Sequence, residues 1–400
     1  MTALDVPGSL RMTRTFGFVF ITSAIFLAMA ASSAPSPLYR VYQDEFGFSA
    51  VMLTVIFAIY TLCLLIALLI TGSLSDCIGR RPVLIAGLGL LAVSMALFLF
   101  ATGTAGLILA RSVQGFATGT LLAALAASVI DLEPPGRTGF GATTNSVAPP
   151  LGMGFGAVIA ALVIDASDSP ADVIFFSLSV VFALMTLIAL ALPETSPRRG
   201  GWRRSLIPRL GVPATARAPF LQSIPALMAS WSLGGLYLSL GPSLVSKVLS
   251  GSSHLEEGLV VICLAGAGAS ASFALRKRTP REITLFGTTA LAVGTALTIV
   301  AIAAESLPGF FVATLVAGTG FGTSFLGVVR SLAHATGPAE RGELFASMYV
   351  VSYLAFGVPA IIAGILTQVI GLRDTAMIYA VFVIVLATTA ALARKLGSTD

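Results

Sequence analysis

Apolar runs of about 20 residues recur along the whole chain, and they limit its possible folds more than any other feature. Each run is long enough to cross the hydrocarbon core of a bilayer, roughly 30 Å thick, as an α-helix. Backbone groups inside lipid need partners within their own segment, and the runs lack the alternation of a membrane β-barrel. Only 10% of the 400 residues are charged, against about 25% in ordinary globular domains. We therefore predict an all-α polytopic membrane protein. Its twelve expected transmembrane helices cover residues 15–36, 50–72, 82–102, 105–130, 139–164, 173–192, 219–241, 257–275, 283–303, 309–331, 343–369 and 375–393.

A polar stretch rich in Arg, Pro and Gly separates the sixth expected span from the seventh. It predicts a cytoplasmic linker at residues 193–218 between two pseudo-symmetric six-helix bundles, residues 1–192 and 219–400. The linker is either a simple tether or carries a short amphipathic helix at residues 202–210, which would lie on the inner leaflet.

Lys and Arg are distributed unevenly between the two sides that these spans define. With the N-terminus inside, 19 of the 23 basic residues fall on cytoplasmic segments or span ends, and only three fall on the other side. The positive-inside rule therefore predicts that both termini are cytoplasmic, in a cell inner (plasma) membrane. The formal charge of +5 then reflects topology and headgroup contact rather than nucleic-acid binding. A signal peptide at the N-terminus is the alternative for the first run, but eleven further spans favour an uncleaved first helix.

The turn between the second and third spans, "GSLSDCIGRR" at residues 72–81, is polar although long apolar runs flank it. Its glycines permit a tight turn and close helix approach, while its arginines add positive charge on the inner side. The defined positions, which match the signature G-x-L-x-D-x-x-G-R-R, are Gly72, Leu74, Asp76, Gly79, Arg80 and Arg81. At this point the chain resembles the major facilitator superfamily, and the resemblance covers essentially its whole length.

The resemblance implies that this turn is a conformational switch and not a catalytic site. Asp76 would bind the start of the eleventh span, near Glu343, in one conformation and release it in the other. A helix N-terminus favours such a carboxylate through its free N–H groups and its dipole. Arg80 would pair with Asp131, or with Glu133 as the second choice, at the inner end of the fourth span. The alternative is that these charges only fix the topology.

Arg111 is a basic residue inside an expected span. The surrounding small and polar helical face consists of Arg111, Gln114, Gly115, Thr118 and Gly119. Its first three members resemble the R-x-x-Q-G signature of the family's fourth span. A cation in the membrane is costly even on permissive insertion scales, so a functional role is the default expectation. Snorkelling to the nearby interface is the alternative.

The expected spans contain no carboxylate well inside them, so the sequence offers no obvious proton carrier in mid-membrane. The remaining candidates are Asp76, Asp131 and Glu343 near the inner face, and Asp44 and Glu45 outside.

The fifth span contains "NSVAPPLGMGFG", in which Asn145, Pro149 and the following glycines allow a kink and close packing. The segment resembles the G-P-x-x-G-G signature of the drug:proton antiporter branch, which has twelve spans. The match is imperfect because no Gly precedes either Pro, and it favours export over import only modestly.

By the same resemblance, spans one, four, seven and ten line a central substrate cavity. Trp231 and Tyr237 on span seven and Tyr353 on span eleven are candidate contacts, and Trp231 could stack on a flat or cationic compound. Each of them can equally be a packing residue. Further candidates are Thr22, Ser23, Gln222, Ser230, Thr319, Thr323 and Ser324.

The leading functional hypothesis is a secondary active transporter that exports small amphipathic molecules by alternating access, with proton antiport implied by the resemblance. An organic-anion or metabolite transporter with Arg111 as the anion site is the alternative. A membrane sensor would need a soluble output domain, and the expected tails are short. The sequence shows no Walker motif, metal-ligand cluster or catalytic triad, so no cofactor, metal or enzymatic activity is expected. The expected partners are a small-molecule substrate, protons and the lipid bilayer, without nucleic acid, and a monomer suffices.

Overall fold

The computed structural model describes residues 13–396 except 137–138, 197, 199–200, 209 and 338–339. Within this part of the chain, every regular element is a helix. The first half contains α1 (Arg14–Ser33), α2 (Pro35–Phe46), α3 (Ala50–Thr71), α4 (Leu74–Ile78), α5 (Arg80–Leu99), α6 (Thr104–Asp131), α7 (Phe140–Ala166) and α8 (Pro170–Ala189). The linker contains α9 (Trp202–Ser205) and η1 (Ala214–Ala216). The second half contains α10 (Arg217–Ser239), α11 (Gly241–Lys247), α12 (His254–Ala274), α13 (Pro280–Ala303), α14 (Leu307–His334), α15 (Arg341–Ile370) and α16 (Leu372–Leu396).

By length and apolar composition, the described residues form eleven candidate spans. A twelfth appears when α10 and α11, which are bent by 52° relative to each other, count as one span. The predicted fold class, an all-α membrane protein with twelve spans in two bundles, is therefore confirmed. The linker helix is shorter than expected, because α9 ends at Ser205 and Pro208 disfavours helical backbone just before it. Four basic residues used to predict the orientation, Arg11, Arg137, Arg199 and Arg209, lie outside the described residues.

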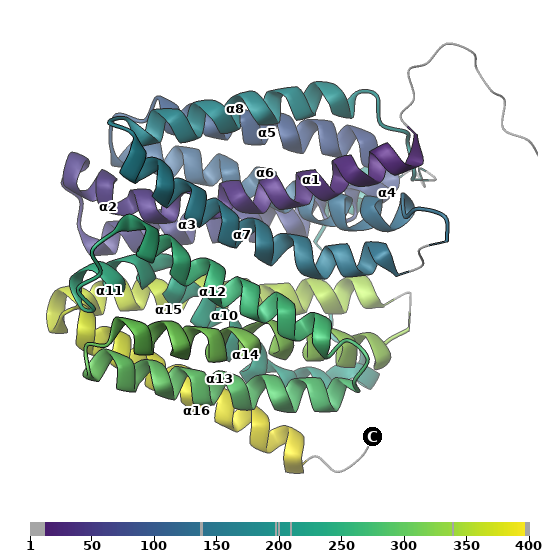
Figure 1. Ribbon diagram of the computed structural model, residues 1–400. Coiled ribbons are helices and arrows are strands. Elements are labelled where there is room, and N and C mark those ends of the chain that lie inside the picture. Colours follow the sequence, from purple (N-terminus) through teal and green to yellow (C-terminus); the bar gives the residue numbers. More distant parts are fainter. Residues whose placement is uncertain are drawn as a thin grey trace, which may run out of the picture.

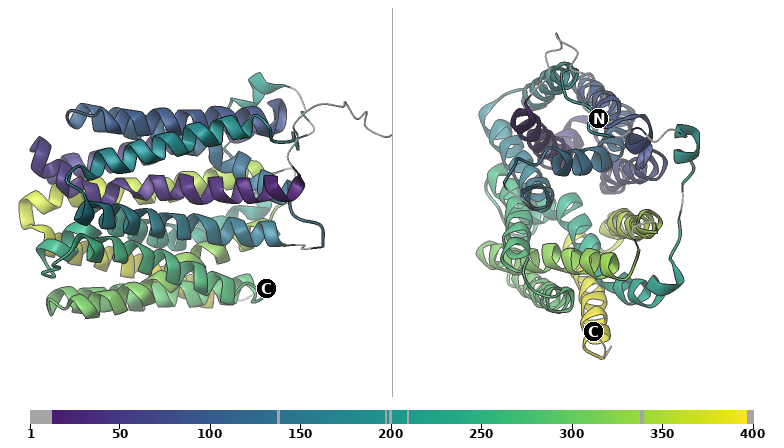
Figure 2. Two further views of the ribbon diagram at one scale, coloured as in Figure 1. Left: turned by 45° about the horizontal axis from the view of Figure 1, so that its top comes forward. Right: turned by 90° about the vertical axis from the view of Figure 1, so that its right-hand side faces the viewer.

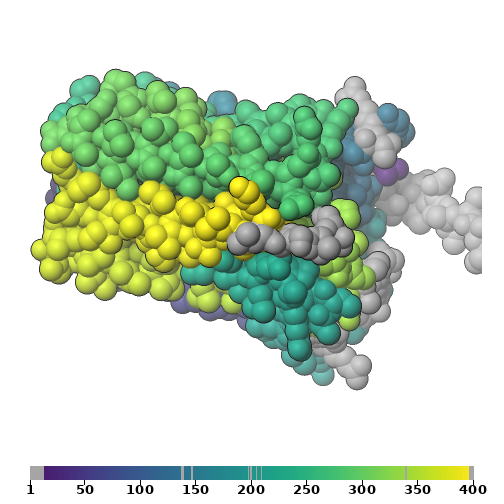
Figure 3. Space-filling model, turned by 90° about the horizontal axis from the view of Figure 1, so that it is seen from below, coloured from purple at the N-terminus to yellow at the C-terminus, as the bar shows by residue number. Residues whose placement is uncertain are grey.

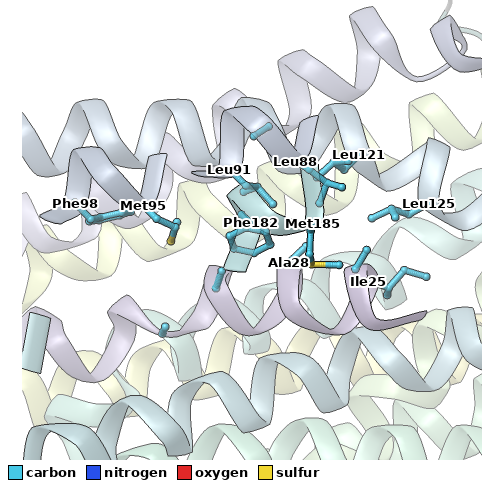
Figure 4. Packing of buried hydrophobic residues seen from close by; sticks show 14 of the residues in the cluster. Ile25, Ala28, Leu88, Leu91, Met95, Phe98, Leu121, Leu125, Phe182 and Met185 are labelled. Atoms are coloured by element: carbon cyan, nitrogen blue, oxygen red, sulfur yellow. The ribbon is translucent and has the colours of Figure 1, made fainter. Parts of the chain in front are cut away.

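Helices α1–α8 form one bundle and α10–α16 the other, one above the other in Figure 1. Side chains from α1, α5, α6 and α8 meet in the core of the first bundle (Figure 4). At one edge of this core, the rings of Phe98 and Phe175 stack with their centroids 4.5 Å apart. Helix α1 begins and α16 ends at the same end of the bundles (Figure 2). We call this end the basic end, because its turns carry Arg80, Arg81 and Arg276. We call the other end of the bundles the opposite end.

Large apolar side chains cover the outer faces of both bundles. Examples are Phe176 and Leu187 on α8 and Val300 on α13, which are 61%, 62% and 62% exposed. Helix α16, yellow in Figure 3, lies on the surface between the green helices of its bundle and the teal α10. An apolar exterior of this extent suits lipid, because water would make it an aggregation surface.

The two bundles meet along two helix pairs, α7 with α12 and α3 with α15. Both pairs approach most closely in the half nearer the opposite end. A Cβ at Gly258 of α12 would lie only 2.8 Å from the carbonyl oxygen of Ala157 on α7, and one at Gly364 of α15 would overlap Thr54 of α3. Glycine thus permits tight closure there.

Candidate functional site

Arg111 and Gln114 on α6 fasten that helix to the end of α1. Nη1 of Arg111 donates to the carbonyl of Ser32 at 3.0 Å, and Nε2 of Gln114 donates to the carbonyl of Ala31 at 2.8 Å. Pro35 begins α2 and has no N–H, so it cannot donate to Ala31 as a residue of a continuing helix would. The two side chains therefore satisfy carbonyl groups at the break between α1 and α2.

The guanidinium of Arg111 is enclosed by protein, and the residue is only 1% exposed. Its Nε donates to the Tyr39 hydroxyl at 2.7 Å, its Nη2 bonds the same oxygen, and its Nη1 also donates to Gln114 Oε1 at 2.6 Å. The ring centroids of Tyr39, Tyr60 and Phe98 lie 5.3, 5.2 and 5.8 Å from its Cζ. Within the described chain, no carboxylate forms an ion pair with it. Hydrogen-bond acceptors and ring faces thus stabilise the cation, which does not snorkel to the surface.

Two of the other three residues of this face, Gly115 and Thr118, belong to the helix scaffold. A Cβ at Gly115 would overlap the carbonyl oxygen of Tyr60 on α3, so glycine lets α6 and α3 approach. Thr118 donates to the carbonyl of Gln114, one turn earlier in its own helix, at 2.8 Å. The structure therefore brings the five predicted residues of α6 together on one buried face against α1 and α3.

Arg80 lies at the centre of a hydrogen-bond network at the basic end. Gly79, with a φ of 117°, lets the chain turn from α4 into α5, which begins at Arg80. The Arg80 Nε lies 3.4 Å from Oδ2 of Asp131 on α6, and its Nη1 bonds both Asp76 and, at 2.7 Å, Ser75 Oγ. The Arg80 to Asp131 pair that the family resemblance implies is thus present in this structure, and Arg80 also neutralises Asp76.

The remaining predicted residues of the turn lie at its two edges. Gly72 follows α3 directly, with its N–H donating to Leu68 at 2.9 Å. Arg81 is half-buried in the first turn of α5.

Glu194 in the linker caps α5, although nothing in the sequence pattern singled it out. Its Oε1 accepts from the N–H of Arg80 at 2.8 Å and from the N–H of Ser196 at 3.0 Å. A Cβ on Gly79 would overlap this carboxylate, so the glycine also makes room for it. The available sequence signal was the dipeptide Pro193-Glu194 after an apolar run. It could not reveal which helix Glu194 caps, because Arg80 lies 114 residues earlier in the chain.

The linker, and not Asp76, contacts the start of α15 in this structure. The backbone of Gly211 exchanges hydrogen bonds with Ser347 Oγ at 3.1 and 3.2 Å, and the carboxylate of Glu343 lies beside the same glycine. Asp76 is bonded to Arg80 instead, and its side chain is 46% exposed. A contact between Asp76 and α15 would therefore require another conformation.

A cavity of about 760 Å³ lies between the bundles in the half nearer the basic end. It is formed where α7 and α12 diverge, with α1 as the third wall. Its lining residues are Thr22, Ser23, Phe26, Leu27, Phe140, Thr143, Thr144, Val147, Ala148, Leu151, Ala269, Ser270 and Phe273. None of these carries a charge, and Thr22, Thr143 and Thr144 donate their hydroxyls to their own helices. The cavity surface is therefore mainly apolar.

Helix α7 lies between α1 above it and α12 below it in Figure 1, and all three helices line the cavity. Its alternating glycines face different neighbours: Cβ atoms at Gly152 and Gly156 would overlap the backbone of α1, whereas one at Gly154 would lie 2.7 Å from Ile262 of α12. Asn145 donates to the carbonyl of Ala126 on α6 at 2.8 Å. Pro149 lies inside α7 and cannot donate to the carbonyl one turn earlier.

The predicted aromatic contacts lie away from this cavity. Trp231 packs edge-on against Tyr353 with ring centroids 4.8 Å apart, in a cluster that also contains Phe325 and Phe356. Tyr237 is buried and its hydroxyl bonds Thr314 at 3.1 Å inside the second bundle. The structure thus joins Trp231 to Tyr353 but separates both from Tyr237.

Three side-chain contacts join the bundles at the opposite end. Nη1 of Arg40 on α2 lies 3.0 Å from Oε1 of Glu257 on α12. His254 Nδ1 lies 2.7 Å from Asp165 Oδ1, and Ser36 Oγ donates to the carbonyl of Leu238 at 3.1 Å. Of the paired acids Glu256 and Glu257, the first completes a capping box with Ser253 and the second turns inward. The sequence signal for Glu257 was this pair of adjacent acidic residues before an apolar run. Helix capping explains Glu256 but not Glu257.

A metal centre finds no support in the described residues, since no three or more His, Cys, Asp or Glu side chains gather into a site. Two bundles of membrane-spanning helices that touch at one end, with a cavity between them at the other, are typical of a membrane transporter. A family model described as Major Facilitator Superfamily matches residues 21–325. The chain belongs to this superfamily.

Relatives and solved structures agree with that assignment. The inner membrane transport protein YnfM of Escherichia coli is 32% identical over 117 residues, which cover 28% of each chain. The probable transporter AQR1 of Saccharomyces cerevisiae is 32% identical over 171 residues, 41% of this chain and 28% of AQR1. The alignment thus spans little more than a quarter of each relative. A crystal structure of a bacterial homolog to the human lysosomal transporter Spinster, inward-facing and unoccupied, superposes with a TM-score of 0.77 at 13% identity, covering 96% and 97% of the two chains.

Proposed function

We propose that this transporter exports small amphipathic molecules by alternating access, with proton antiport as the driving reaction. The observation that carries the proposal is the cavity of about 760 Å³ between the bundles. Its size is in the range of about 300–1,000 Å³ that drug-sized ligands occupy. Its aromatic and aliphatic walls can bury the apolar body of a ligand, and its hydroxyls can orient a polar group.

The alternative, an organic-anion transporter with Arg111 as the anion site, has less support. Arg111 does not line the cavity, and its three guanidinium nitrogens all bond protein atoms. An anion would have to displace the carbonyl of Ser32 or the hydroxyl of Tyr39 to reach it. Such a displacement costs the hydrogen bonds that hold α6 to α1.

The direction of export follows from the orientation that we propose. The basic end would face the cytoplasm of an inner or plasma membrane, since Lys and Arg favour that side. The cavity then opens to the cytoplasm, and the contacts of Arg40, His254 and Ser36 close the outside. Residues 1–192 and 219–400 would rock as two units about the cavity, joined by the linker at 193–218.

The test is the interior pH of proteoliposomes that contain the purified chain and an imposed proton gradient. Cationic, neutral and anionic amphipathic compounds are added in turn. We expect cationic or neutral compounds to dissipate the gradient and anionic ones to have no effect. Dissipation by anions alone would reject the proposal in favour of the alternative.

A cavity variant links the activity to the proposed site. Ala148→Trp places an indole in the cavity and should slow the compound-driven proton movement. Leu187→Trp is the matched control, because Leu187 is 62% exposed on the outer face of α8. Equal rates in the two variants would place the substrate elsewhere.

A further inference from the structure

Glu257 is the one acidic residue in the buried class among the residues that the structure describes, and the proposed function assigns it no role. Its side chain is 2% exposed, and its Oε1 accepts from Arg40. Its Oε2 is buried and has no hydrogen-bond partner in the described part of the chain. A buried ionised carboxylate with one unsatisfied oxygen is costly, because it has lost its hydration without full compensation.

Arg40 compensates this charge only in part. Its own side chain is 42% exposed, so water weakens its attraction for the carboxylate. The other titratable group that faces Glu257 is His254 on the same helix, whose ring bonds Asp165 of α7, while Ser246 of α11 faces it with a hydroxyl. From α10 and α14, which also pack against α12, no described charged group acts on it.

We propose that Glu257 is a proton-binding site that holds a proton while the opposite end is closed. The proton leaves hydronium in the water at that end and forms an O–H bond with one carboxyl oxygen. Arg40 keeps its charge and can donate to the other oxygen in either form. The inference rests on the proposed proton antiport, for which it names the coupling residue.

The position of Glu257 couples the proton to the motion of the bundles. Arg40 belongs to the first bundle and Glu257 to the second, so the two separate when the opposite end opens. In the open state water hydrates the carboxylate, which favours its charged form; in the closed state burial favours the neutral acid. A ligand stabilises the state that binds it more tightly, so proton binding favours closure. Closure with a proton bound then separates that proton from the water at the opposite end.

The experiment measures closure directly, without substrate or gradient. Spin labels are attached at Asp168→Cys and Ser252→Cys, two exposed positions on either side of the opposite end, in a chain whose Cys63, Cys77 and Cys263 are replaced by Ala. Distances between the labels are recorded by double electron–electron resonance in nanodiscs at pH 8 and pH 5. We expect acid to lower the open-to-closed ratio by about tenfold, or about 1.4 kcal/mol.

Three variants decide whether Glu257 causes this response. Glu257→Gln, which mimics the neutral acid, should be closed at both pH values, whereas Glu257→Asp should retain the response. His254→Gln is the control, since a protonated His254 would also favour closure through Asp165, and this variant should respond as the unmodified chain does.

Two results of the spin-label experiment would overturn the inference. One is a pH response that persists in Glu257→Gln, and the other is opening at low pH, which an electrostatic clamp between Arg40 and Glu257 would give. Compound-driven proton movement at full rate in Glu257→Gln would also reject it while leaving antiport intact. Conversely, closure by acid in a chain that shows no antiport would reject only the proposed function.

Discussion

At the residue scale, Arg111 shows how an expected functional residue can be part of the scaffold. The sequence singles it out because a cation within a span is costly. The structure shows how that cost is met: the Ser32 carbonyl at the end of α1, the Gln114 side-chain oxygen, a tyrosine hydroxyl and three aromatic rings surround the guanidinium. Spacing on one helix predicted that Gln114 and Gly115 share its face, but its partners on α1 and α2 come from another part of the chain.

Arg111→Lys should lower the free energy of unfolding by on the order of 2 kcal/mol, because an ammonium group lacks the planar fork that bonds Tyr39, Ser32 and Gln114 together. Arg111→Ala should lower it further. Thermal unfolding of the purified chain in detergent measures both. Lys277→Ala, at an exposed position of the turn after α12, should leave stability unchanged. A Lys variant of normal stability that fails to transport would instead indicate a direct role in transport.

At the scale of elements, some glycines lie where two helices approach most closely and others do not. The sequence predicts close packing from its glycines, but only the structure shows that Gly115 faces α3 while Gly266 on α12 has open space around it. Helix spans were predictable because each must cross lipid by itself.

Gly115→Ala and Gly266→Ala form a matched pair. The first should destabilise the chain by about 1–3 kcal/mol, because its Cβ would overlap the backbone of Tyr60. The second should be neutral or stabilise by up to about 1 kcal/mol, since alanine is the better helix former. Unfolding in detergent measures both, and equal effects would contradict the packing assigned to α3 and α6.

Glu194→Ala tests the cap on α5. Loss of the hydrogen bonds to Arg80 and Ser196 should cost about 1 kcal/mol, the usual contribution of a helix cap. Glu305→Ala breaks the exposed pair with Arg373 and should cost less than about 0.5 kcal/mol. If both variants unfold alike, Glu194 contributes only a surface ion pair.

At the scale of the whole molecule, the bundles touch at the opposite end and part at the basic end, where Asp76 is bonded to Arg80 and not to α15. The proposed switch therefore has to act in the other conformation, in which the basic end closes. A carboxylate at the start of α15 would then favour closure through the helix dipole.

Asp76→Asn should accordingly shift the population toward the state that is open at the basic end and should slow turnover. The measurement is the rate at which a water-soluble thiol reagent modifies Thr144→Cys in the cavity, which should rise. Asp44→Asn, exposed near the opposite end, is the control. Unchanged labelling and turnover in Asp76→Asn would mean that the charges of this turn serve topology alone.

By itself, the sequence determined the membrane class, the twelve spans and the motif faces on single helices, because lipid imposes its requirements on each segment separately. Only the tertiary structure decided which charges meet: Glu194 with the start of α5, Arg111 with the end of α1, and Glu257 with Arg40 across the two bundles. Those partners lie 79 to 217 residues apart in the chain. Burial and ion pairing depend on how whole helices pack, and local hydrophobic periodicity does not encode that packing.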